Sequence, residues 1–129
     1  MNSDELKKRT KDFGIRVIRL VESLPTKKSA NMIGHQLMRS ATSVGANYRS
    51  ACRGRSKAEF IAKLGISIEE ADESLYWMEI LLDTGLAAEN QISDLMKEAH
   101  ELVAILTAAV KTARSNIKKS GKSNQQSEI

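Results

Sequence analysis

The stretch RSATSVGANYRSACRGRS, residues 39–56, decides the fold class of this chain. Its four serines, two glycines and four arginines would suit a disordered basic linker, a catalytic loop with a serine nucleophile, or one face of a tightly packed helix. The apolar residues in and before the stretch exclude the linker. Steps of four or three residues, the period of one helix face, join Ile33, Leu37, Ala41, Val44, Tyr48 and Ala51. We therefore predict one continuous helix over residues 27–53.

The small residues of this helix predict close packing rather than catalysis. Each glycine inside a helix costs about 1 kcal/mol relative to alanine, but small side chains let a second backbone come near. A nucleophilic serine needs a base within reach, and the two histidines, His35 and His100, do not supply one, since His35 lies on a different helix face from Ser40. No Glu-x-x-His pair forms half of a metal site. We predict a non-enzymatic protein without a cofactor or a metal.

We predict three further helices, one before and two after the helix over residues 27–53. A helix over residues 4–24, with Ser3 as its N-cap, ends before Pro25, because the residue before a proline avoids the helical conformation. Ser56 and Glu59 form a capping box that starts the next helix. Its apolar stripe comprises Phe60, Leu64, Ile68, Ala71, Leu75, Met78 and Leu82.

The chain is then predicted to turn at Gly85 and to begin its last helix near residues 88–90. The stripe of this helix comprises Ile92, Leu95, Ala99, Leu102, Leu106, Ala109, Ala113 and Ile117. Four long helices with short connections predict an all-α, antiparallel, up-down-up-down four-helix bundle. We place this single domain at residues 1–119, followed by a disordered polar tail at residues 120–129.

Charge is divided unevenly along the chain, although the total is only +4. Residues 1–57 hold thirteen basic and four acidic residues, a net charge of +9, whereas residues 58–109 hold two and eleven, a net charge of −9. The two parts can attract each other within the bundle or between subunits, or the basic part can meet an anionic partner. A lone cysteine, Cys52, and no secretory signal at the N-terminus predict a cytoplasmic protein, and no apolar run could span a membrane.

The basic residues around the opening stretch predict a nucleic-acid surface. The candidates are Arg49, Arg53, Arg55 and Lys57, with Arg16 and Arg19 from the first helix. Lysines and arginines of this kind bind phosphates, and few aromatic residues lie among them to stack on bases, so we expect recognition of RNA backbone and shape. The alternative is that these arginines pair with acids of the third helix or of a neighbouring subunit.

A second group of residues predicts contacts between subunits. Tyr76 and Trp77 are adjacent and therefore point about 100° apart, so at least one lies off the core seam. Exposed aromatic residues commonly anchor protein interfaces, while the alternative is a position at the flank of the core. Arg39, close to the packed face, is expected to pair with acids such as Glu70 and Glu73, inside or between subunits.

Two segments, QLMRSATSVGANYRSA (residues 36–51) and FIAKLGISIEEADESLYWMEIL (residues 60–81), resemble a family of small bacterial four-helix-bundle proteins. Its founding members are encoded by intervening sequences in 23S rRNA genes, and it includes the accessory variability protein of diversity-generating retroelements. The resemblance covers about residues 10–115 and implies a homopentamer with a basic surface for nucleic acid or reverse transcriptase. It favours a self-associating adaptor for structured RNA or an RNA-bound protein; the alternative is a purely structural interaction module.

Overall fold

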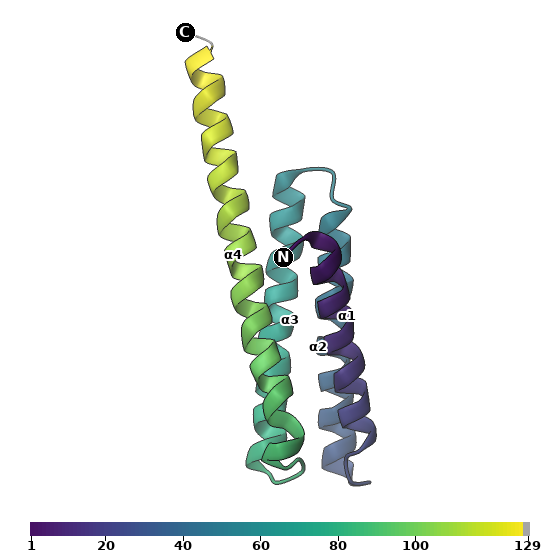
Figure 1. The fold of residues 1–129 in the computed structure, drawn as a ribbon. Helices are drawn as coiled ribbons and strands as arrows, with labels where there is room; N and C mark the ends of the chain where they lie inside the picture. The colour runs from purple at the N-terminus through teal and green to yellow at the C-terminus, as the bar shows by residue number, and fades with distance from the viewer. Residues whose placement is uncertain (128–129) are drawn as a thin grey trace.

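The computed structural model describes residues 1–127, with side chains described as far as residue 119. Its four helices are α1 (Ser3–Glu22), α2 (Lys28–Cys52), α3 (Lys57–Asp83) and α4 (Glu89–Ser127). Successive helices run in opposite directions (Figure 1). Each packs on its neighbour in the chain, and α1 closes the ring against α4 over a less extensive contact. The predicted all-α, antiparallel four-helix bundle is confirmed, and no strand occurs among the described residues.

The helix starts follow local capping chemistry. The side chain of Asn2, rather than the predicted Ser3, caps α1 by accepting a hydrogen bond from the Glu5 N–H at 2.8 Å. Ser56 caps α3 as predicted and accepts from the Glu59 N–H at 3.1 Å. The carboxylate of Glu59 reaches back one residue further than in a standard capping box, to the Arg55 N–H at 3.2 Å.

The helix ends are less regular than the starts. α1 ends at Glu22, before the predicted Leu24. α3 ends at Asp83, and Gly85 follows two residues later with a left-handed φ of +74°. The backbone of α4 is helical as far as Ser127, whereas a disordered polar tail was predicted from residue 120. In Figure 1 this end of α4 extends beyond the other three helices. Residues 128–129 of the predicted tail lie outside the described residues, and the division into a domain of residues 1–119 and a tail stays a prediction.

The core contains most of the predicted stripes, and the departures are at single positions. In the middle of α3, Ser67 is fully buried and the predicted Ile68 is only partly buried. In α3, Leu81 is fully buried where Leu82 was predicted. In α4, Val110 is buried where Ala109 was predicted, and Ile117 is 40% exposed. Ala113, one turn beyond Ala109, is buried as predicted, so the departures do not accumulate along the helix. The buried face of a bundle helix is wider than a one-residue stripe, so a neighbouring residue can take the core position.

No helix within the described residues is long and apolar enough to span a bilayer.

Candidate functional site

Helices α1 and α2 approach each other closely because glycines face the partner backbone. A Cβ atom placed on Gly45 would lie 3.2 Å from the carbonyl carbon of Thr10, and one on Gly14 would lie 3.4 Å from the Cα of Thr42. Contacts of this length with backbone atoms leave little room for a larger residue. The small residues of the opening stretch therefore serve helix packing, as predicted.

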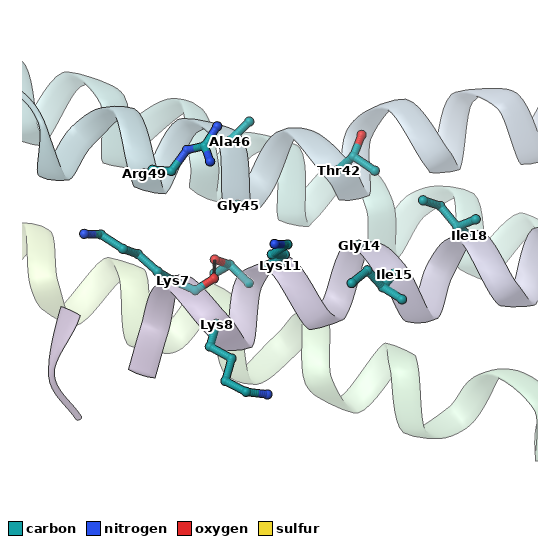
Figure 2. A pocket seen from close by; sticks show the side chains of 11 residues that line it. Lys7, Lys8, Lys11, Gly14, Ile15, Ile18, Thr42, Gly45, Ala46 and Arg49 are labelled. Carbon is teal, nitrogen blue, oxygen red and sulfur yellow. Dashed lines mark hydrogen bonds between the residues drawn. The ribbon is translucent and has the colours of Figure 1, made fainter. Parts of the chain in front are cut away.

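On the solvent side of this contact lies an open groove of about 560 Å³ between α1 and α2. Figure 2 shows that its two ends differ in chemistry. Lys7, Lys11 and Arg49 lie toward one end. The other end is lined by Gly14, Thr42, Ile15 and Ile18, of which the two isoleucines are exposed. We call this feature the α1–α2 groove.

The cations of the α1–α2 groove differ in whether they form ion pairs. Lys8 turns away from α2 (Figure 2) and pairs with Asp12 at 2.8 Å. Lys7 makes a long contact of 3.9 Å with Asp4. Lys11 and Arg49 are exposed and have no ion pair within the described part of the chain. No carboxylate among the described side chains lines the groove, so the positive charges of Lys11 and Arg49 are uncompensated there.

The other predicted RNA-binding residues of α2 and the following turn lie at the end of the bundle nearest Arg49. Arg53 follows the last residue of α2, Arg55 lies in the turn and Lys57 begins α3. All three are exposed, and no ion pair holds any of them among the residues with described side chains. Gly54 does not have a positive φ. Its lack of a side chain matters instead, because a Cβ there would lie only 3.0 Å from the Ala51 carbonyl oxygen.

Arg16 and Arg19 do not join this surface. They are exposed on α1 but border hollows beside α4, where Arg16 lies near Glu98 and Arg19 near Asp94. The structure therefore brings Arg49, Arg53, Arg55 and Lys57 to one end of the bundle and leaves the two α1 arginines beside carboxylates of α4.

The predicted subunit-contact residues Arg39, Glu70 and Glu73 meet within one chain. The Arg39 guanidinium donates to the Glu70 carboxylate at 3.2 Å and also to that of Glu73, which joins α2 to α3. The Trp77 indole N–H donates to Glu73 at 3.3 Å and extends this cluster. The ion pairs expected for Arg39 inside a subunit are thus present; a role between subunits stays a prediction.

Tyr76 and Trp77 take up the two different positions that their adjacency predicts. Their rings make an edge-to-face contact with centroids 5.1 Å apart. Trp77 is half-buried against the core, whereas Tyr76 is 54% exposed. Tyr76 is therefore the residue of this pair that is free to meet another protein.

Ser40 of the opening stretch and Ser67 of α3 use their hydroxyls in helix packing. Ser40 is fully buried, and its hydroxyl lies 2.9 Å from that of Ser74 and donates to the Leu37 carbonyl at 3.2 Å. Ser67 likewise donates to the Val44 carbonyl. These hydroxyls satisfy one another and the backbone where α2 and α3 pack closely.

One ion-pair cluster was not identified from the sequence. Arg9 on α1 donates to both carboxylate oxygens of Glu98 on α4, at 2.8 and 2.6 Å, and to Glu101 at 2.9 Å. The hydrogen bond from Arg9 lowers the pKa of Glu98 below its ordinary value of 4.5, against the effect of burial. The same bond raises the pKa of Arg9. The one sequence signal for this cluster was the opposite net charge of residues 1–57 and 58–109, which does not identify the pairing residues.

Burial also raises the pKa of the Tyr48 hydroxyl, with a further contribution from the neighbouring Cys52. Cys52 packs against the core, as a small apolar residue would.

The fold and this surface define a class of protein: a charge-segregated, antiparallel four-helix bundle with an open cationic face on α1 and α2. The sequence pattern of the family described as 23S rRNA-intervening sequence protein matches residues 3–108, and the chain belongs to this family. It is also similar to a crystal structure from Bacteroides thetaiotaomicron, described as a protein with unknown function from the S23 ribosomal protein family. The two are 32% identical with a TM-score of 0.80, over 86% of this chain and 99% of the other. No curated protein matches this sequence.

Proposed function

We propose that this protein is a self-associating adaptor that binds structured RNA, or an RNA-bound protein, through the part of its predicted basic surface that lies at the end of α2 and in the turn to α3. The observation that carries the proposal is the group Arg49, Arg53, Arg55 and Lys57, which is exposed at one end of the bundle and unpaired among the described side chains. Free cations gathered in this way suit phosphates, whereas Arg39 and Arg9 already hold carboxylates.

The kind of RNA contact follows from the residues that accompany these cations. Of the aromatic residues, Tyr48 and Phe60 are close to them in sequence; Tyr48 is buried in the core and Phe60 packs against it. Stacking on unpaired bases therefore has no platform here, and contacts to phosphates and helix shape are favoured. The family name, which refers to 23S rRNA, supports an RNA-related role without defining it.

Reversing Arg53 and Arg55 to glutamate should weaken binding of a fluorescein-labelled RNA hairpin about tenfold at moderate salt and reduce the salt dependence by about two phosphate contacts. Fluorescence anisotropy between about 50 and 200 mM salt measures both quantities. Lys27→Glu with Lys28→Glu is the matched control, because it changes the net charge equally at the opposite end of α2.

Equal weakening by the two double variants would show that only net charge matters, and the RNA surface would be rejected. Weak, unchanged binding by all three proteins would leave the alternative, a structural interaction module whose arginines make subunit contacts.

Self-association forms the second part of the proposal, and we propose a homopentamer, as the resemblance noted from the sequence implies. The exposed Tyr76 on α3 supports an interface there, with Trp77 and the Arg39–Glu70–Glu73 cluster beside it. A large aromatic residue left 54% exposed is a typical interface anchor.

Tyr76→Glu is expected to lower the particle mass measured by light scattering, because a charge would be buried at the interface. Met32→Glu is a close control, since Met32 is also 54% exposed but lies on α2. Loss of mass in both variants would point to a general effect of added charge, and no loss in either would place the interface elsewhere.

A further inference from the structure

The α1–α2 groove shares Arg49 with the RNA surface, but it has a shape and an apolar end that the RNA surface does not use. Its lining on α1 extends from Lys7 to Ile18, which corresponds to about 17 Å of helix. Its floor, between the two ends, holds the small residues Gly14, Gly45 and Ala46. The two glycines face the other helix of the α1–α2 pair, and Ala46 is exposed. These dimensions suit a helix of about twelve residues laid along the groove.

The two ends of the groove require different groups from one occupant. Lys11 and Arg49 present positive charge that no carboxylate within the described residues neutralises. Ile15 and Ile18 lie one helical turn apart with 36% and 37% of their surface exposed. RNA phosphates would satisfy the cationic end but would leave both isoleucines in water. An occupant with carboxylates at one end and aliphatic side chains at the other would satisfy both.

From this complementarity we propose that the α1–α2 groove docks an acidic amphipathic helix of a protein partner. Its carboxylates meet Lys7, Lys11 and Arg49, and its aliphatic residues pack on Ile15 and Ile18. This is the helix-in-groove mode of recognition, in which main affinity comes from apolar anchors and charges set the direction of the helix. The proposal goes beyond the RNA contact and does not depend on it, because the groove alone carries it.

The probe is a fluorescein-labelled, end-capped peptide of about 14 residues, close to the shortest length at which an isolated helix is stable. One face carries glutamates in its first half and leucines in its second. Two control peptides replace the glutamates with glutamine or the leucines with serine. Fluorescence anisotropy with the full-length protein, in the absence of RNA, gives the affinity of each peptide.

Three variants test the two ends and the floor of the groove. Lys11→Gln with Arg49→Gln should weaken peptide binding about tenfold, as expected for two exposed charge pairs. Ile15→Ser with Ile18→Ser should weaken it about tenfold or more through lost apolar burial. Ala46→Leu should block the floor; Ala46 is exposed, so this variant is expected to fold. The controls are Lys27→Gln with Lys28→Gln, and Met32→Ser, which lie outside the groove.

The expected result is weaker binding by all three groove variants and by both control peptides, with the outside variants unchanged. Binding that depends on the cations but not on the isoleucines or Ala46 would overturn the proposal in favour of a non-specific polyanion surface. A lower particle mass for Ala46→Leu in light scattering would also overturn it, because a second copy would then occupy the groove. Since Ala46→Leu keeps Arg53 and Arg55, its affinity for the RNA hairpin should not change, which separates this test from that of the RNA surface.

Discussion

Replacing Gly45 with leucine should lower the free energy of unfolding by about 2 to 3 kcal/mol, the range typical of an overpacked contact. A Cβ atom at this position would already lie 3.2 to 3.3 Å from backbone atoms of Thr10 and Lys11. A backbone cannot turn aside as a side chain can, so α1 and α2 would have to separate and lose packing along their length. Urea unfolding followed by circular dichroism measures the change.

The matched control for this prediction is Gly65→Leu in α3. Gly65 also lies inside a helix, but apart from its chain neighbours and the nearby backbone of that helix, no atom lies within 4 Å of a Cβ placed on it. Leucine there should stabilise the protein by about 0.5 to 1 kcal/mol, because glycine is a poor helix former. If both variants were stabilised, the approach of α1 to α2 would not depend on the absence of a side chain at Gly45.

Replacing Arg9 with methionine should cost about 2 kcal/mol, as expected for losing hydrogen bonds between charged groups at a partly buried site. The methionine keeps the apolar stem but leaves the Glu98 carboxylate, 13% exposed, without its main partner. The contact between α1 and α4 is the least extensive of the four helix contacts, so other residues compensate little. Lys8→Met is the control, because its pair with Asp12 is exposed and should contribute less than about 1 kcal/mol.

The contribution of Arg9 should depend on pH in a defined direction. Because the folded pKa of Glu98 lies below 4.5, its pair stabilises the protein fully above about pH 4.5 and is lost as the pH falls through the lowered pKa. The difference in unfolding free energy between wild type and Arg9→Met should therefore be constant near neutral pH and shrink in acid. Urea titrations at several pH values test this, and a difference that stays the same in acid would show that Arg9 acts through packing alone.

The sequence alone determined the helices and most of their buried faces. Apolar spacing, the Ser56 cap and the Gly85 turn are local signals, because capping and helix periodicity involve residues a few positions apart. Predictions were wrong by one position at Ile68, Leu82 and Ala109, because the apolar face of a bundle helix is wide enough for a neighbouring residue to take the buried position.

The spacing of residues along the chain did not determine which acids the arginines pair with, because a charge can pair with any opposite charge that the fold brings near. Only the tertiary structure showed that Arg39 pairs with Glu70 and Glu73 and Arg9 with Glu98 across helices, while Arg49 and Arg53 lack such partners among the described residues. It also placed Ile15 and Ile18 in one groove with Lys11 and Arg49. Local sequence determines helices through short-range contacts, whereas a surface is assembled from residues distant in the chain, whose neighbours depend on how the helices pack.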